Sequence, residues 1–280
     1  MIFAARNIRA SRVNLMMNDF ACGLPSPLSF IGLADAIVRD LGLQPWSGRA
    51  LPILHRVTPS EGRTKPEMEP KTKDKTTAFR PIETMEDMVG SVEISLLLDI
   101  PGCESASDIA AAFTRRRIAG GIIQNDRIDV ESVTADGAAF RGLQRGYVML
   151  APNPDDRPEL LATSTGDAVS YGRILDLLFP DEREPGSGWI IPIAAGYQLL
   201  EDPDEAPPRI RRRDPTIPHV FAEPVLGLAE LVSVRARRLT GLQGAAFQSL
   251  FWSWHAEGGN LFGHSAYRST AIQKEDIVHD

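Results

Sequence analysis

Cysteine is nearly absent from this chain, since Cys22 and Cys103 are the only two among 280 residues. Neither has a second cysteine at a spacing typical of metal binding or redox exchange, which argues against a disulfide scaffold and a cysteine-based zinc site. We therefore expect both residues to be buried free thiols.

Motifs for metal, nucleotide or nucleophilic chemistry are missing as well. The sequence contains no Walker loop, no dinucleotide fingerprint and no Gly-x-Ser-x-Gly elbow. No histidine stands at a ligand spacing from another histidine, a cysteine or an aspartate. The histidines are His55, His219, His255, His264 and His279. We expect neither a metal nor a cofactor.

Long uncharged apolar runs are also lacking. The longest candidate, around residues 24–41, is interrupted by Asp35, Arg39 and Asp40, and the chain does not open with a basic start, an apolar core and a cleavage site. We expect a cytoplasmic protein with no membrane partner.

Positive charge is in deficit, because the formal net charge is −7. Such a protein is not expected to coat nucleic acid indiscriminately, and any contact with nucleic acid must be local. Lysine occurs only at positions 65, 71, 73, 75 and 274, so the other 25 of the 30 basic residues are arginine. The planar guanidinium suits phosphate and base-edge contacts, although a genome rich in G and C would also favour arginine.

The best-defined element is a helix within residues 23–42. Ser26 suits the N-cap, Pro27 the first helical position and Gly42 a left-handed stop. Apolar residues recur at three- and four-residue steps around most of the cylinder, which indicates a helix packed on a sheet.

Around this helix the pattern predicts strands at residues 2–10, 51–57 and 92–100, a helix at 105–116 and a last strand from Ile122. The order strand, helix, strand, strand, helix, strand is that of the ferredoxin-like or RRM fold. Residues 58–87 are rich in proline and mixed charge, so we expect an exposed insertion or hairpin. We thus predict an α+β protein with a ferredoxin-like domain at residues 1–134.

Residues 135–280 are less regular and are expected to form a second α+β part. We predict strands at 146–151 and 189–200, with Pro192 at an edge or bulge, and helices at 167–179 and 245–255. Residues 202–218 form a loop rich in proline and charge.

The strongest candidate site is Arg115-Arg116-Arg117-Ile-Ala-Gly120-Gly121. Glycines let backbone amides approach a phosphate, and the arginines supply charge. The alternative is a glycine helix stop whose arginines favour the helix dipole. Further basic candidates are Arg6, Arg9 and Arg12 near the first strand, followed by Asn14, then Arg209 with Arg211, Arg212 and Arg213, and finally Arg235, Arg237 and Arg238. With a period of two, Arg6, Arg9 and Arg12 cannot share one face of a regular strand, so some should lie at its end.

Four segments, in order, resemble one CRISPR-associated family, the second Csy subunits of type I-F surveillance complexes. They are Phe30-Ile-Gly-Leu-Ala-Asp-Ala-Ile37 in the first helix, Arg117-Ile-Ala-Gly-Gly121, Gly188-Trp-Ile-Ile-Pro-Ile-Ala-Ala-Gly-Tyr197 and Phe221-Ala-Glu-Pro-Val-Leu-Gly-Leu-Ala-Glu-Leu-Val232. The chain is short for that family, which is compatible with a variant type I-F or a related type IV system.

The resemblance implies a noncatalytic RAMP-superfamily subunit that caps the five-prime handle of a CRISPR guide RNA. Its implied partners are that RNA, the backbone RAMP subunit and the large subunit, with target DNA met indirectly through base pairing. Related RAMP proteins place a glycine-rich loop on the RNA where this chain has Gly120 and Gly121. Two alternatives remain open: a RAMP endoribonuclease, for which His55 is the candidate base, and a module that binds protein alone.

Overall fold

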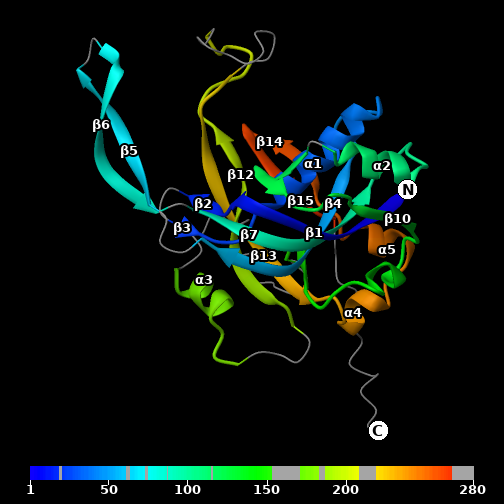
Figure 1. Ribbon diagram of the computed structural model, residues 1–280. Helices are drawn as coiled ribbons and strands as arrows, with labels where there is room; N and C mark the ends of the chain where they lie inside the picture. The colour runs from blue at the N-terminus through cyan, green and yellow to red at the C-terminus, as the bar shows by residue number, and fades with distance from the viewer. Residues whose placement is uncertain are drawn as a thin grey trace.

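A computed structural model describes residues 1–18, 21–60, 64–72, 75–86, 88–114, 116–152, 171–182, 187–207 and 219–266, with the backbone alone for 18, 64–72, 75–86 and 171–174. The described chain is a strand-rich α+β protein, in agreement with the predicted class (Figure 1). Its main sheet is antiparallel, with strand order β14-β15-β12-β13-β11-β4-β7-β1-β9-β8 and β10 also paired to β1. The strands are β1 (Ile2–Asn14), β2 (Met16–Asn18), β3 (Ala21–Cys22), β4 (Arg49–Pro59), β5 (Thr64–Thr72), β6 (Lys75–Glu86), β7 (Val89–Asp99), β8 (Arg117–Ile118), β9 (Gly121–Ile123), β10 (Asp129–Val133), β11 (Tyr147–Leu150), β12 (Trp189–Leu199), β13 (Ala222–Ser233), β14 (Ser253–Glu257) and β15 (Asn260–His264).

The first helix, α1 (Pro27–Asp40), has the ends that its sequence predicts. The Ser26 hydroxyl accepts a hydrogen bond from the Leu28 amide, and Gly42 follows the helix with a φ of +67°. Ser26 also donates to the carbonyl of Ala194 in β12, at 2.6 Å. The helix therefore spans both halves of the sheet, with one end fixed to the C-terminal half.

The N-terminal half places β4, β7, β1 and β10 side by side, with α1 leading from β1 to β4 and α2 (Ala106–Ala112) from β7 to β10. The predicted strands 2–10, 51–57 and 92–100 are confirmed as parts of β1, β4 and β7. Their apolar side chains meet both helices in one core, which includes Phe3, Ile8, Phe30, Ile94 and Leu98.

The strand predicted from Ile122 is divided into β9 and β10. Between them the Gln124 amide donates to the Arg9 carbonyl at 2.8 Å, and the Asn125 side chain binds the backbone of β1. These bonds to β1 take the place of a regular strand ladder at residues 124–128.

The segment 58–87 contains β5 and β6, which pair with each other in a separate sheet (Figure 1). At its base the Ser60 amide donates to the Val89 carbonyl at 2.8 Å, next to the pair Pro59 and Gly90. The ends of β4 and β7 are therefore already joined without the hairpin.

The C-terminal half extends the same sheet, because β11 pairs with β4 through Tyr147 with Leu54 and Val148 with Ile53. The sheet is thus continuous across residue 134, and the division into two domains there stays a prediction. A second core lies on the face away from α1, where η1 (Gly137–Phe140), α4 (Arg237–Thr240) and α5 (Gly244–Gln248) meet the sheet. Phe140, Phe247 and Phe251 form its aromatic centre.

The prediction that Pro192 lies at a strand edge or bulge is confirmed. Its strand β12 pairs with β13 at this level, whereas β15 meets β12 only at Gly196 to Gln198, so Pro192 lies where β12 has a free edge in the described structure. The predicted strand 146–151 is confirmed by β11, and α3 (Tyr171–Leu178) lies within the predicted helix 167–179, of which residues 167–170 are outside the described residues.

Two expectations are wrong. The helix expected at 245–255 ends after α5, because the backbone of Trp252 exchanges hydrogen bonds with Ala50 and its indole donates to the Met149 carbonyl at 2.8 Å. The chain then continues as β14. Cys103 is a buried free thiol as expected, but Cys22, in the short β2–β3 hairpin, is exposed. Within the residues described, no helix is both long and apolar enough to cross a membrane.

We predict that the β5–β6 hairpin can be replaced without loss of the core. Joining Ser60 to Met88 by a short Gly-Ser turn should change the midpoint of thermal unfolding by less than about 3 °C, because the flanking strands keep their pairing. In the intact protein, limited proteolysis should cut within residues 60–80 first. Protection of this segment equal to that of residues 92–100, or loss of folding on replacement, would contradict the prediction.

Candidate nucleic-acid interface

The face of the sheet opposite α1 and α2 is divided into an apolar and a polar half. Ile2 of β1, Leu97 of β7 and Ile53 of β4 lie in the second core. Further along the same strands the face turns polar, and a groove of about 540 Å³ opens there. It is lined by Arg9, Ala10, Ser11, Arg56, Thr58, Ser91, Val92, Glu93 and Gln124.

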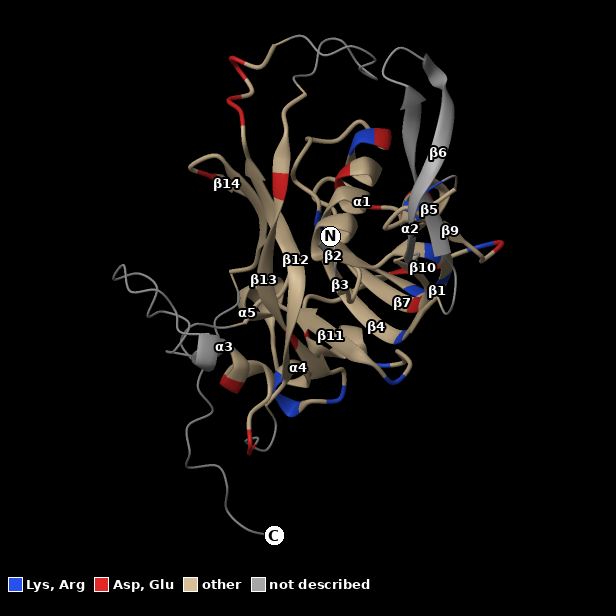
Figure 2. Ribbon diagram, turned by 90° about the vertical axis from the view of Figure 1, so that its left-hand side faces the viewer, with Lys and Arg blue, Asp and Glu red and all other residues tan. Residues whose placement is uncertain are grey.

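Basic positions lie in several parts of the described chain. In Figure 2 they recur along β1 and β4 and also on α1 and α4, while acidic positions follow the end of β12. The acidic positions after β12 include Glu201, Asp202, Asp204 and Glu205. The exposed Arg9 and Arg56 at the groove nevertheless form a local basic site on a chain with net negative charge, as a local contact with nucleic acid requires.

Irregularities in β1 decide where its arginines point. The register with β7 shifts between Ala5 and Ile8 and again between Ala10 and Val13, and Asn7 and Arg12 have φ of +52° and +56°. Some of Arg6, Arg9 and Arg12 were expected at the strand end; all three are within β1, and Arg12 lies two residues before its last residue, Asn14. Since Ala5 and Ile8 both face the helix-side core, the extra residue brings Arg6 and Arg9 to the opposite face.

The buried hydroxyl of Ser95 in β7 holds this bulge and a second one. It accepts a hydrogen bond from the Asn7 amide of β1 at 3.2 Å, and on its other side it meets Nε2 of His55 at 2.8 Å. His55 lies at a register shift of β4, between Leu54 and Arg56. One side chain on the central strand therefore satisfies polar groups at bulges of both neighbouring strands.

The tautomer of His55 follows from its partners. Nδ1 lies 3.3 Å from the carbonyl of Arg145, which can only accept, so Nδ1 carries the proton and Nε2 accepts from Ser95. Burial lowers the pKa of His55 below its ordinary value, while the hydrogen bond to Arg145 and the nearby Glu93 carboxylate act in the opposite direction. The ring is thus neutral and occupied at both nitrogens.

Asn125 fixes the same bulge of β1 from the opposite edge. Its side-chain oxygen accepts from the Arg9 amide at 2.7 Å, and its amide donates to the Asn7 carbonyl at 3.0 Å. With Ser95, the backbone of Asn7 has a partner on each side. The positions of Arg6 and Arg9 are therefore set by the fold rather than by the arginines themselves.

The arginines of this surface differ in what they already bind. Arg6 is held by an ion pair with Glu131 of β10. Within the described part of the chain, the guanidinium groups of Arg9, Arg12 and Arg56 have no hydrogen bond or ion pair, although all three side chains are exposed. Arg9, Arg12 and Arg56 can therefore meet a ligand without breaking an existing contact.

The glycine loop is the turn of a hairpin. Ala119 and Gly120 have φ of +45° and +77° between β8 and β9, as a tight turn requires. A side chain at Gly121 would lie 2.7 Å from the Ser11 carbonyl and 2.6 Å from Val13, so this position needs glycine for its approach to β1. The Asn14 amide, at the end of β1, donates to the Ala119 carbonyl.

The alternative of a glycine helix stop is wrong, because α2 already ends at Ala112. Of the loop arginines, Arg116 pairs with Asp40 and donates to the Ala36 carbonyl of α1, so it ties the two helices together. Arg117 is exposed and donates to the Gly120 carbonyl at 3.1 Å. Arg115 lies outside the described residues.

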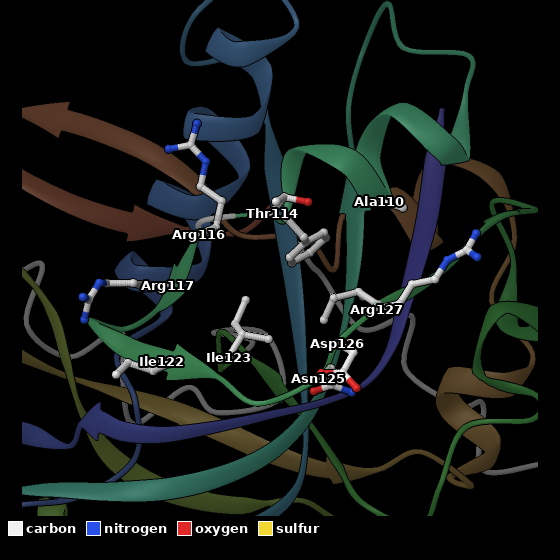
Figure 3. Close-up of a pocket in the computed structure, with 11 residues that line it drawn as sticks. Ala110, Thr114, Arg116, Arg117, Ile122, Ile123, Asn125, Asp126 and Arg127 are labelled. Carbon is white, nitrogen blue, oxygen red and sulfur yellow. The ribbon is translucent and has the colours of Figure 1, made fainter.

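A second cavity, of about 430 Å³, lies between α2 and the β9–β10 connection. Figure 3 shows Arg116 and Arg117 at one side of it, at the start of β8, and Arg127 at the other side, in the loop before β10, with their guanidinium groups pointing outward. The apolar side chains of Phe113, Ile123 and Ile128 also line it.

The structure thus places Arg9, Arg12, Asn14, Arg117, Gly120 and Gly121 along β1 and the β8–β9 hairpin, whereas Arg6 lies further along β1, opposite β10. Arg209, Arg211, Arg212 and Arg213 lie outside the described residues. Arg235 donates to the Leu143 carbonyl and Arg238 pairs with buried Glu230, so these residues serve the fold.

The groove also contains residues that the sequence analysis missed. Arg56, Glu93 and Gln124 line it, and Asn125 organises its edge. Arg56 and Glu93 are polar positions in the predicted strands 51–57 and 92–100, so strand alternation was the available signal.

We predict that Ser95→Ala lowers the free energy of unfolding by about 1–3 kcal/mol, because the Asn7 amide and His55 lose a buried partner. The matched control is Ser91→Ala, on the same strand and face but exposed, which should change it by less than about 0.5 kcal/mol. Urea unfolding of the three proteins measures both effects. Equal losses in the two variants would show that Ser95 does not hold the bulges.

The chain is similar to CRISPR-associated proteins of one kind. A family model described as CRISPR-associated protein (Cas_Csy2) matches residues 176–263. The chain is 26% identical over 301 residues to CRISPR-associated protein Csy2 of Pseudomonas aeruginosa (strain UCBPP-PA14), and the alignment covers 87% of this chain and 88% of that protein. These matches confirm the resemblance to the second Csy subunits that the sequence motifs indicate.

Proposed function

We propose that this Csy2-like chain is a noncatalytic RNA-binding subunit of a type I-F-like CRISPR surveillance complex. In that role it holds the five-prime handle of the guide RNA and anchors the backbone and large subunits beside it. The similarity to Csy2 along most of the chain supports membership of such a complex. The RNA contact itself is inferred from the groove and the glycine loop.

The proposal includes a ferredoxin-like RAMP assignment for the N-terminal half. Its support is the strand order β4-β7-β1-β10 with antiparallel neighbours and a helix on each crossover. In chain order these are the second, third, first and fourth strands, which is the ferredoxin-like arrangement. Sheets of this kind frequently serve as platforms for single-stranded RNA.

The observation that carries the proposal is the set of exposed arginines at the groove. Arg9 and Arg56 face it from β1 and β4, and Arg117 lies on the edge strand β8, separated from β1 by β9. The guanidinium groups of Arg9 and Arg56 can bind phosphates or stack on bases without losing an internal partner, whereas Arg117 also donates to the Gly120 carbonyl. The arginines of the groove also give a chain with a net charge of −7 a local basic site for RNA.

The absence of catalysis is part of the proposal. A general base for cleavage of RNA needs a ring nitrogen free to accept the 2′-hydroxyl proton. In His55 one nitrogen is protonated towards Arg145 and the other accepts from Ser95, which leaves a structural role for this residue.

We therefore expect repeat RNA to remain intact when incubated with the purified protein. Denaturing gel electrophoresis checks this, and a preparation of His55→Gln controls for contaminating nucleases. Site-specific cleavage that disappears in His55→Gln would establish the endoribonuclease alternative.

RNA binding itself is tested by purifying the complex from its native host and sequencing the bound RNA. We expect guide RNA, and its absence from an assembled complex would favour a module that binds protein alone. In binding measurements with the purified protein, Arg9→Gln, Arg56→Gln and Arg117→Gln should each weaken affinity for single-stranded RNA about tenfold. Each should also reduce the salt dependence by about 0.7 units of log–log slope.

The matched control is Arg237→Gln, an exposed arginine of α4 away from the groove, which should change neither affinity nor slope. Arg116→Gln should mainly lower thermal stability, because this side chain joins α2 to α1. Unchanged slopes in the variants of Arg9, Arg56 and Arg117 would remove the RNA contact from this surface.

A further inference from the structure

A single carboxylate lies in the middle of the arginine-lined groove. Register pairs place Glu93 of β7 directly between Arg9 of β1 and Arg56 of β4, so the three side chains form one row across the sheet. All of them line the groove, and Glu93 is half-buried. Among the described residues no ion pair joins Glu93 to either arginine.

A carboxylate at this position weakens the binding of a phosphate group. It repels the RNA backbone and weakens the field of the neighbouring guanidinium groups. Glu93 does not serve to neutralise these arginines, because it forms no ion pair with either of them. A carboxylate in a nucleic-acid groove is instead useful where a base presents hydrogen-bond donors, since an ionised carboxylate can only accept.

We propose that the groove takes a guanine base of the bound RNA and that Glu93 reads its Watson–Crick edge. Guanine presents two adjacent donors there, N1–H and the N2 amine, which match the two oxygens of a carboxylate. This inference rests on the proposed RNA-binding function and names the base class that the site selects.

The other bases fit the row less well. Adenine and cytosine each offer one amine beside a ring acceptor, and uracil offers one N–H between two carbonyls. In each case at least one acceptor faces the carboxylate, and the pairing is monodentate at best. A single nucleotide fits a groove of about 540 Å³.

The side chains around Glu93 can bind the other parts of a guanine nucleotide whose Watson–Crick edge faces this carboxylate. Arg9 and Arg56, on either side of Glu93, can stack on the base or bind its flanking phosphates. The hydroxyls of Ser91 and Thr58, which pair across β7 and β4, line the same groove and can meet the 2′-hydroxyl or the guanine O6. Gln124 is held by the Ser11 hydroxyl at 2.8 Å, so the wall on the β9 side is preformed.

The test measures binding of the full chain to single-stranded oligouridylates of about eight nucleotides, which match a typical site size. Five probes carry guanosine, inosine, adenosine, cytidine or uridine at the central position. The guanosine probe should bind about five- to 150-fold more tightly than the uridine probe. The inosine probe, which lacks the N2 amine, should lie between them. Equal binding of all five probes overturns the inference and leaves the proposed function standing.

The decisive variant is Glu93→Gln, which keeps the shape of the side chain. It should abolish the guanosine preference, while the uridine probe should bind as tightly as before or more tightly, because a negative charge is removed. The control Glu104→Gln makes the same charge change at an exposed position outside the groove and should keep the preference. A preference that persists in Glu93→Gln overturns the assignment.

Two further outcomes separate this inference from its premise. If the wild-type chain and its assembled complex bind no RNA, the proposed function fails, and the inference fails with it. If Glu93→Gln keeps its base preference but loses a neighbouring subunit on copurification, Glu93 contacts protein and the base-reading role is wrong. The inosine comparison uses the wild-type chain alone, so the test stands even if the variant does not fold.

Discussion

The hydrogen bonds of the Ser95 hydroxyl are the constraint on which the proposed RNA-binding surface depends. This group lies fully buried on the central strand β7 and is shared by the Asn7 amide of β1 and the ring of His55 in β4. Without a polar group here, both neighbouring strands would leave unsatisfied backbone or ring atoms at their bulges. The bulges in turn decide that Arg9, Glu93 and Arg56 stand in one row.

The two faces of the N-terminal sheet serve different purposes. The face on the side of α1 and α2 packs against these helices in the first core. The other is covered at one end by the second core and is polar at the other end, with the change at Ser95 in β7 and after Ile53 in β4. The C-terminal half therefore supports the platform and leaves its polar end open among the described residues.

Local sequence signals were sufficient for most of the elements. The capped helix α1, the alternating strands β4 and β7 and the proline-rich insertion are each determined by residues close in sequence. The same logic failed for residues 252–255, where Trp252 pairs with Ala50, which lies far earlier in the chain. It also failed for β1, because a period of two cannot anticipate bulges that are held by Ser95 and Asn125.

The candidate site was predictable in part for the same reason. Arginine and glycine content identified β1 and the hairpin turn at Gly120, but the separation of Arg116 from Arg117 depends on Asp40, which lies on another element. Glu93 and Arg56 were unremarkable within their strands until pairing placed them beside Arg9.

The pairing of β4 with β11 has a consequence for synthesis of the protein on the ribosome. Until Tyr147 to Leu150 have emerged, β4 ends the growing sheet with unpaired backbone groups. The α1 surface that meets β12 and β15 stays uncovered longer, until those later strands have been made. At translation rates of about 5–20 residues per second, β4 waits for β11 on the order of ten seconds. An unpaired strand edge exposed for that long invites pairing with another nascent chain, and this hazard ends when β11 pairs with β4.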